Sequence, residues 1–401
     1  MATARLVLTD GTLFTGEAFG AEATRGGEVV FNTAHTGYQE VISDPSYCGQ
    51  IVCMTCPLQG NYGVNDDDQE SARPFIEGFV VRELSAIASN FRSRGRLDEM
   101  LAKHGIPGIA DIDTRALTLR LRSGGAINGV LSTRDESDIE LLRRARELPP
   151  MTGRDLVRQV ATSKIVEWQS GFDGVYGANP PDRPADKHVV ALDCGMKRNI
   201  LRHLVHIGCR VTILPPTALY GDILEREPDG VFVSNGPGDP AAVLHVQYTL
   251  REVATKVPVF GICLGHQLLA LAFGAETYKL KFGHHGYNHP VKNLLTERVE
   301  ITSQNHGFAV SERSLQEIGL EQTHVNLNDG SVEGFRHREL PLFAVQYHPE
   351  AAPGPHDAAY LFDCFRTILD ERRPLNADDM RTAQQALAAR GVATTGKKVS
   401  G

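Results

Sequence analysis

A cysteine between two glycines lies where an apolar run gives way to a helical pattern. Val257–Ile262 is typical of a buried strand and Leu264–Phe273 of a helix, so Cys263 occupies the turn between them. Gly261 and Gly265 permit a tight turn that projects the thiol above a sheet. A helix N-terminus also favours thiolate and offers N–H groups to an oxyanion. The turn predicts a nucleophile, although a cysteine buried in the core is the commoner case.

A thiol nucleophile needs a base that can return a proton to the leaving group. The sequence His348-Pro349-Glu350 follows the apolar segment Leu342–Gln346, which we expect to be a strand. Residues i and i+2 of an extended chain share a face, and proline restricts the backbone, so Glu350 can orient His348. Together with the turn at Cys263, this sequence predicts a Cys-His-Glu triad.

A third candidate element is the glycine-rich loop Ser234–Pro240, which also follows a predicted strand. Glycines allow backbone N–H groups to approach a substrate closely, so the N–H groups of Gly236 and Leu264 are candidates for an oxyanion hole. Alone, the loop would be an ordinary tight turn. Its place at a strand end favours a role in the same site.

These residues need a scaffold, and the first part of the chain predicts an α+β domain over residues 1–150. Apolar and polar residues alternate on both sides of Asp10-Gly11, a pair that favours a hairpin. Apolar residues recur with helical spacing in Asp113–Arg122 and Glu136–Leu148.

The rest of the chain predicts an α/β domain. Residues 151–187 form a connecting segment whose end is rich in Gly, Pro and Asp, which indicates a linker. Strands and helices then alternate through residues 188–373, and this order predicts a mostly parallel sheet with its site at the carboxyl ends of the strands. We expect residues 374–401 to be a disordered tail with at most one loose helix, at Ala377–Arg390.

Composition excludes several classes of function. The chain has 401 residues and a formal net charge of −8, so it has no global positive field to hold nucleic acid or an anionic membrane. The apolar window Val257–Ala275 is interrupted by glycine and polar residues, so no membrane span is expected. Met1–Asp10 lacks the order of a secretory signal, and we expect a cytoplasmic protein with its seven cysteines unpaired.

Taken together, the motifs resemble the class I, triad-type glutamine amidotransferases, through Gly261–Gln267, Asn235–Gly238 and His348–Glu350. Further motifs are similar to the small, glutamine-hydrolysing subunits of carbamoyl-phosphate synthetases, and several lie in the N-terminal domain that other class I enzymes lack. They are Phe31–Thr33, Gly37–Val41, Asp44–Tyr47, Phe282–Val291, Gln304–Phe308 and Gly354–Ala359.

The resemblance implies that Cys263, His348 and Glu350 hydrolyse L-glutamine, and that the ammonia passes to a large subunit in a heterodimer. That partner would bind ATP and Mg²⁺ and make carbamoyl phosphate from bicarbonate, whereas this chain would need no cofactor and no metal. The implied glutamine contacts are Ser46, Gly236, Gly238, Leu264, Gln267, Asn305, Gly307 and Phe308.

Two rival functions stay open. One is a catalytically silent subunit that only binds a partner, which the intact triad disfavours. The other is a glutaminase for a different synthetase, such as anthranilate or guanylate synthesis, which the N-terminal domain disfavours. Carbamoyl phosphate feeds arginine and pyrimidine biosynthesis, and the sequence does not choose between them.

Three further clusters are weaker candidates. Cys48, Cys53 and Cys56 have the spacing of three iron–sulfur ligands, but they surround an apolar segment typical of a strand and lack an obvious fourth cysteine. Three histidines, at positions 284, 285 and 289, suggest a metal site, yet hydrogen bonding at the pocket rim explains them better. The acidic run Asp66–Asp68 is typical of a solvated turn.

Overall fold

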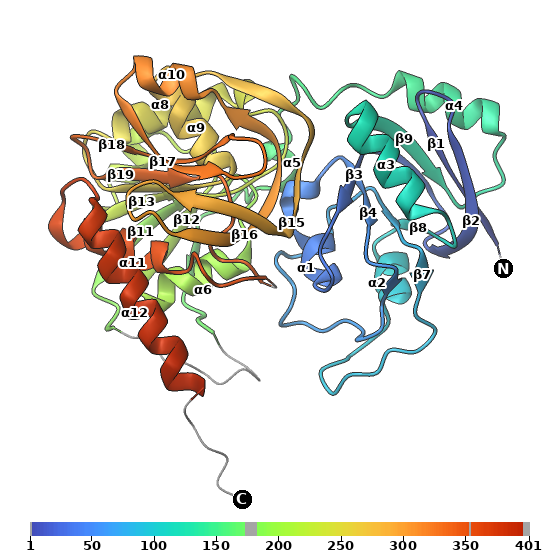
Figure 1. The fold of residues 1–401 in the computed structure, drawn as a ribbon, viewed down its shortest axis with the longest axis horizontal. Coiled ribbons are helices and arrows are strands. Elements are labelled where there is room, and N and C mark those ends of the chain that lie inside the picture. The colour runs from blue at the N-terminus through green and yellow to red at the C-terminus, as the bar shows by residue number, and fades with distance from the viewer. Residues whose placement is uncertain (1, 173–182, 353, 396–401) are drawn as a thin grey trace, which may run out of the picture.

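The computed structural model describes residues 2–172, 183–352 and 354–395. Figure 1 shows the N-terminal domain on the right, in blue to green, and the C-terminal domain on the left, in green to red. Residues 173–182, the middle of the predicted linker, lie outside the described residues. Among the described residues, no helix is both long enough and apolar enough to cross a membrane.

The N-terminal domain is a closed barrel with the strand order β1-β2-β8-β6-β4-β3-β9. The Asp10-Gly11 pair forms the expected hairpin between β1 and β2, with Gly11 at φ 90°. The barrel strands are β1 (Thr3–Leu8), β2 (Leu13–Gly20), β3 (Thr24–Asn32), β4 (Gln50–Met54), β6 (Gly78–Val80), β8 (Pro107–Ala110) and β9 (Ile127–Ser132). Around them lie α1 (Tyr38–Ser43), the 3-10 turn η1 (Pro45–Tyr47), β5 (Leu58–Gln59), β7 (Glu83–Leu84), α2 (Leu97–Lys103), α3 (Thr114–Gly124) and α4 (Asp138–Glu147).

The C-terminal domain is built on a ten-stranded sheet with the order β10-β12-β11-β13-β14-β19-β18-β17-β15-β16. Its strands are β10 (Val166–Trp168), β11 (Lys187–Leu192), β12 (Cys209–Leu214), β13 (Gly230–Val233), β14 (Val259–Ile262), β15 (Thr277–Asn293), β16 (Val299–Val310), β17 (Leu320–Asn326), β18 (Val332–His337) and β19 (Leu342–Val345). Its helices are α5 (Val157–Val160), α6 (Arg198–His206), α7 (Tyr220–Leu224), η2 (Pro240–Ala242), α8 (Leu244–Val253), α9 (Leu264–Ala272), α10 (Glu312–Glu317), α11 (Tyr360–Glu371) and α12 (Ala377–Thr395).

The predicted mostly parallel sheet is a mixed sheet. Strands β12, β11, β13, β14 and β19 are parallel, but β10 and the whole half from β18 to β16 pair antiparallel. The reason lies in residues 277–337, where only the short α10 intervenes between strands and no crossover helix makes strands parallel. Strand β15 pairs antiparallel with both β16 and β17, and β17 pairs antiparallel with β18. Strand β10 belongs to the predicted connecting segment 151–187, yet it pairs with the sheet edge.

Two apolar cores cover the two faces of the parallel half. Alternate strand residues such as Val190 and Val259 pack with α8 and α9, while Val189 and Phe260 pack with α6 and α11. This arrangement buries the parallel strands on both faces. It leaves their carboxyl ends, where Cys263 lies, as the edge at which a site can form.

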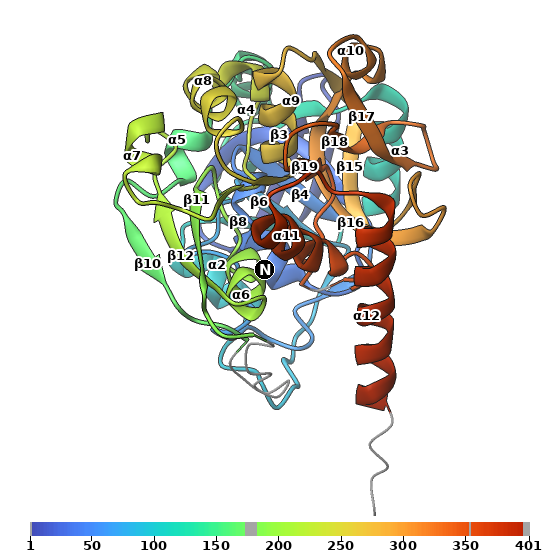
Figure 2. The ribbon, with the colours of Figure 1, turned by 90° about the vertical axis from the view of Figure 1, so that its left-hand side faces the viewer.

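The chain after residue 374 is more ordered than the disordered tail that we expected. Helix α12 runs alongside α11, as the red helix at the right of Figure 2 shows. Met380, Ala383 and Leu387, at positions i, i+3 and i+7, pack against the core beside α11. Composition was a poor guide because three modest apolar residues on one face are enough to hold a helix whose other faces are polar. Residues 396–401 lie outside the described residues.

The two domains meet along β15, which extends from the C-terminal sheet to the barrel (Figure 1). The Thr33 N–H donates to His285 O over 3.2 Å, and the Ala126 N–H donates to Lys281 O over 2.7 Å. A Cβ added at Gly286 would lie 2.0 Å from Thr33 Oγ1, so only glycine allows this approach. The interface is therefore closely fitted along this strand.

Candidate active site

Cys263 lies in a strained turn between β14 and α9. Its backbone has φ 55° and ψ −104°, a conformation that L-residues rarely adopt. A Cβ on Gly265 would lie 2.2 Å from the carbonyl oxygen of Val233, and one on Gly261 would lie 2.9 Å from Gly265 O. The two glycines are therefore required by close packing of the turn against the sheet, as the predicted strand–turn–helix elbow demands.

His348 and Glu350 lie at the end of the adjacent strand, β19. His348 Nδ1 and Glu350 Oε1 are 2.7 Å apart, and both side chains are buried. Burial alone lowers the pKa of His348, but the charge of Glu350 and the neighbouring Cys263 outweigh it and raise that pKa. Among the described residues, His348 Nε2 has no hydrogen bond within the usual geometric limits, so this nitrogen stays available toward Cys263.

Lys197, which was not among the predicted site residues, contacts the carboxylate of Glu350 from the predicted triad. Its Nζ lies 3.0 Å from Glu350 Oε1 and donates to Ala351 O over 2.9 Å, and the side chain is buried. Burial alone raises the pKa of Glu350, but Lys197 and then His348 outweigh it and lower that pKa to about 2. A lysine just past the carboxyl end of β11 was the available signal, because that is where sites form in such sheets.

The thiol faces a pocket that gathers most of the predicted glutamine contacts. Cys263 lines it together with Ser46, Gly236, Gly238, Gln267, Asn305, Gly307 and Phe308. Leu264 is the exception, since its side chain belongs to the core. Its backbone N–H lies at the first position of α9, where helices leave N–H groups without intrahelical partners. The predicted contacts that line the pocket thus come from four separate segments, and their contact roles stay predictions.

The N-terminal domain reaches this pocket through the segment after α1. Asp44 accepts a hydrogen bond from the Ser46 N–H over 2.9 Å, which shapes the turn. The Asn235 side chain donates to Ser46 Oγ over 2.9 Å, and the Asn305 side chain donates to Asp44 Oδ2 over 2.8 Å. One N-terminal turn therefore ties the loop after β13 to strand β16 of the C-terminal domain.

Several pocket residues were absent from the predicted contacts: Gln50, Met151, Pro237, Lys279, His285 and His306. Lys279 Nζ lies 2.8 Å from Glu28 Oε2 of the barrel and 4.9 Å from the centre of the Phe308 ring. Gln267 donates to Phe308 O over 2.8 Å and to Gln346 Oε1 over 2.9 Å. Pro237, His285 and His306 lie within motifs of the resemblance, whereas Gln50, Met151 and Lys279 belong to none, so only the fold could bring these three to the pocket.

A histidine cluster lies behind the pocket. Across the described residues, the side chains close enough to share a metal ion are His284, His306 and Glu333, not the three histidines that the sequence suggested. Both ring nitrogens of His306 already have partners, at Phe308 O (2.7 Å) and Gln304 Oε1 (3.0 Å). His284 Nε2 lies 2.9 Å from Asp329. The contacts describe a hydrogen-bonded network.

The three N-terminal cysteines lie in or next to the barrel wall as free thiols. Burial raises the pKa of Cys48 to about 11 and that of Cys53 to about 12, so both stay protonated near neutral pH. They fit a structural role, as the sequence analysis favoured over a cluster.

Comparison with known proteins gives the class of this protein first. A family model described as "Glutamine amidotransferase class-I" matches residues 190–368, which hold the elbow and the His348–Glu350 pair. A second model, "Carbamoyl-phosphate synthase small chain, CPSase domain", matches residues 6–131 in the barrel. The C-terminal domain is thus a class I glutamine amidotransferase domain. The match of the N-terminal domain indicates one family within that class, the carbamoyl-phosphate synthase small chains.

Three curated relatives that are similar over nearly their whole length identify the family, and each is named carbamoyl phosphate synthase small chain. The chain is 52% identical to the Syntrophotalea carbinolica protein (92% of this chain, 98% of the relative) and 51% identical to the Rhodopirellula baltica protein (92% and 97%). It is 51% identical to a Nostoc protein over 96% of this chain and 97% of the relative. The chain belongs to the carbamoyl phosphate synthase small chain family, which confirms the predicted glutamine amidotransferase subunit.

Proposed function

We propose that this chain hydrolyses L-glutamine with Cys263, His348 and Glu350 and passes the ammonia to a large ATP-dependent subunit that makes carbamoyl phosphate from bicarbonate. The observation that carries the proposal is the convergence of the Cys263 elbow and the hydrogen-bonded His348–Glu350 pair at the ends of the paired strands β14 and β19. There the Cys263 N–H donates to Val345 O over 2.9 Å, and the thiol lines the pocket. This arrangement supplies a nucleophile, a base and an orienting carboxylate.

The reaction follows from these positions. His348 takes the proton of the Cys263 thiol, the sulfur attacks the side-chain amide carbon of glutamine, and the carbonyl oxygen becomes an oxyanion. The N–H groups of Gly236 and Leu264 are the proposed donors to this oxyanion. His348 gives its proton to the leaving nitrogen, so the C–N bond breaks and ammonia departs from a γ-glutamyl thioester. His348 then takes a proton from water, which attacks the thioester and releases glutamate and the thiol.

Lys197 and Glu350 set the charge state of this machinery. Glu350 stays ionised because its pKa is low, and it stabilises the imidazolium of His348. Lys197 compensates the buried charge of Glu350 over 3.0 Å. The ion pair thus holds the carboxylate in place when the proton on His348 moves to the substrate.

We assign the reaction that consumes the ammonia to the partner subunit. Making carbamoyl phosphate requires ATP with Mg²⁺, and we assign both to the large subunit, with no cofactor or metal in this chain. The two subunits would form a heterodimer in the cytoplasm. Such a complex would serve arginine biosynthesis, pyrimidine biosynthesis or both.

Reconstitution tests the proposal. The chain is purified with the large subunit from the same organism, and carbamoyl phosphate is measured with ATP, bicarbonate and either glutamine or ammonium. We expect glutamine to support synthesis only when this chain is present, while ammonium supports it with or without the chain. A complex that uses ammonium but never glutamine would favour the silent partner-binding subunit instead.

A further inference from the structure

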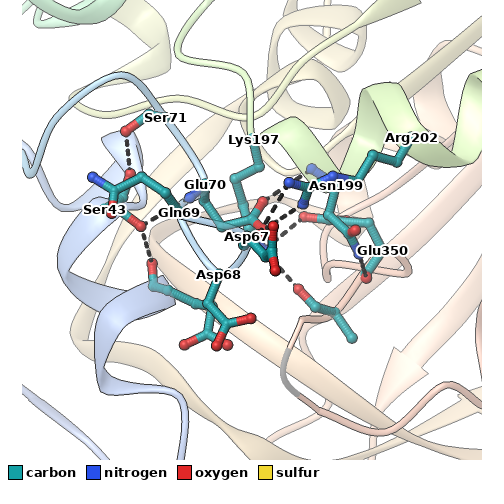
Figure 3. A network of polar contacts seen from close by, with 12 residues as sticks. Ser43, Asp67, Asp68, Gln69, Glu70, Ser71, Lys197, Asn199, Arg202 and Glu350 are labelled. Carbon is teal, nitrogen blue, oxygen red and sulfur yellow. Dashed lines mark hydrogen bonds and ion pairs between the residues drawn. The ribbon is translucent and has the colours of Figure 1, made fainter. Parts of the chain in front are cut away.

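The N-terminal end of helix α6 is capped by a residue of the other domain and not by its own N-cap residue. The side chain of its N-cap residue, Lys197, makes no capping hydrogen bond. Glu70, in the barrel-domain loop between β5 and β6, accepts from the Asn199 N–H at Oε2 over 3.0 Å, and its carbonyl oxygen accepts from the Arg198 N–H over 2.8 Å. Two of the N–H groups that a helix leaves open are therefore satisfied across the domain boundary (Figure 3).

The start of α6 in turn holds the triad carboxylate. The Asn199 side-chain amide donates to the carbonyl oxygen of Glu350, and Lys197 Nζ lies 3.0 Å from Glu350 Oε1. Figure 3 shows these side chains converging on Glu350 from the α6 side. Any displacement of the first turn of α6 therefore moves the lysine that pairs with the Glu350 carboxylate and the amide that holds the Glu350 backbone, and through them the ring of His348.

Glu70 is built into the barrel domain as firmly as into α6. Its side chain is 1% exposed, and Arg202 Nη1 lies 3.5 Å from its Oε1. The Glu70 N–H donates to Ser43 Oγ over 3.0 Å, and the Ser71 hydroxyl donates to Ser43 O. Ser43 is the last residue of α1, directly before the turn whose Asp44 and Ser46 reach the pocket. One short helix thus joins two of the barrel domain's contacts with the site, the turn at Asp44 and Ser46 and the contact through Glu70.

We propose that Glu70 is a positioning residue for the triad: it caps α6 from the N-terminal domain and so makes the alignment of Glu350 and His348 depend on how the two domains are docked. This inference rests on the proposed glutaminase function. In this proposal the barrel domain influences the site in two ways: Asp44 and Ser46 act on the pocket, and Glu70 acts on the base through α6.

The test compares Glu70→Ala, Glu70→Gln and Asn199→Ala in the full chain, with and without the large subunit. We expect Glu70→Ala to lower kcat for glutamine hydrolysis about 10-fold while KM changes by less than about 3-fold, since the lost cap acts on the base and not on the pocket. Gln keeps an oxygen that can accept from the Asn199 N–H, so Glu70→Gln should restore most of kcat. Asn199→Ala should resemble Glu70→Ala.

Asp67→Asn is the matched control. Asp67 lies in the same loop and is also acidic, but it contacts α6 through its backbone oxygen, which accepts from Arg202 over 3.1 Å. A change in its largely exposed side chain should alter kcat by less than about 2-fold. A loss of kcat in this control equal to that in Glu70→Ala would overturn the assignment, because any disturbance of the loop would then suffice.

A second readout separates this inference from the proposed function. Alkylation of Cys263 by iodoacetamide, followed by peptide mass spectrometry, reports thiolate reactivity without any glutamine turnover. We expect Glu70→Ala to slow it, even if the wild-type chain fails to hydrolyse glutamine and the proposed function falls. Unchanged alkylation and unchanged kcat in Glu70→Ala would overturn the positioning role. If Glu70→Ala does not fold, unchanged values in Asn199→Ala would overturn it in the same way.

Discussion

The two domains contribute to the site in different ways. The C-terminal domain supplies the groups proposed to react, Cys263 and His348, each at the end of a parallel strand. The N-terminal domain supplies no group proposed to react. Its residues Asp44, Ser46 and Glu70 hold segments of the C-terminal domain in place at the site. The proposed chemistry therefore lies within one domain, whereas the geometry of the site depends on both.

Replacing the nucleophile should have the largest effect, and it tests whether the chemistry lies in the C-terminal domain alone. We expect Cys263→Ser to lower glutamine-dependent synthesis by the holoenzyme by at least about 10³-fold, because a hydroxyl in this site is a far weaker nucleophile. Synthesis from ammonium should survive. Cys56→Ser, outside the pocket, serves as the control and should behave like the wild type. Near-normal use of glutamine by Cys263→Ser would remove the nucleophile from the account.

The next effect separates the base from its orienting carboxylate. His348→Asn should block both formation and hydrolysis of the thioester. The loss of rate in Glu350→Gln should be about 10- to 100-fold smaller than in His348→Asn, since the carboxylate transfers no proton. Single-turnover rates at saturating glutamine give both values. Because Lys197 lies 3.0 Å from Glu350, removing the charge also leaves a buried lysine without its partner, so the loss will still be substantial. Equal losses in the two variants would mean that Glu350 does more than orient.

A smaller effect is expected at the boundary between the domains. The isolated chain should hydrolyse glutamine slowly, and docking of the large subunit should raise kcat/KM by about 5- to 150-fold, the usual range of coupling between sites. The reason is that Ser46 and Asp44 join the pocket from the barrel domain, so a partner that binds both domains can select the competent arrangement. Steady-state glutaminase assays with and without the partner and its substrates measure this. Identical kcat/KM in both would show that the pocket is fully formed in the free chain.

The smallest effect concerns stability of the C-terminal domain by itself. Burial alone lowers the pKa of His284, but the hydrogen-bonded Asp329 and the nearby Glu333 outweigh it and raise the pKa to about 9. A raised pKa stabilises the fold at pH values below the unfolded pKa, and this contribution is lost as pH rises through about 9. We expect His284→Gln to cost about 1 to 2 kcal/mol at pH 7 and less at pH 10.

Urea unfolding of wild type and variant at the two pH values checks this prediction. The difference between the two midpoints should shrink at pH 10. A difference that grows with pH would mean that His284 is neutral in the folded protein. The KM for glutamine of the folded variant should stay nearly unchanged, because His284 is not among the residues that line the pocket with the predicted substrate contacts.

The local parts of the site could be predicted from sequence because each is a short motif at a predicted strand end. The glycines around Cys263 and the spacing of His348 and Glu350 indicate their roles through backbone geometry alone. The resemblance added Ser46, which no local pattern would have linked to a pocket more than a hundred residues away. Lys197 and Glu70 were missed because a charged residue in a loop usually indicates a solvated surface, and only the fold shows that both are buried.

The fold was predicted well where helices alternate with strands and less well elsewhere. The antiparallel half of the sheet was missed because residues 277–337 were read as motifs and not as strands, although β15 and β16 are the longest pair in the domain. The helix α12 was underestimated because few of its residues are apolar, and only the fold shows that Met380 and Ala383 are buried beside α11. In both places long-range pairing decides the structure, and local propensity carries little of that information.

Trapping the covalent intermediate tests the central claim most directly. The holoenzyme is mixed with glutamine, quenched in acid within the first turnover, digested and mapped by mass spectrometry. We predict that the peptide containing Cys263 gains the mass of one glutamyl group, and that the adduct disappears when Cys263 is replaced by serine. Glutamine turnover without any adduct on Cys263, or with an adduct on another residue, would contradict the account.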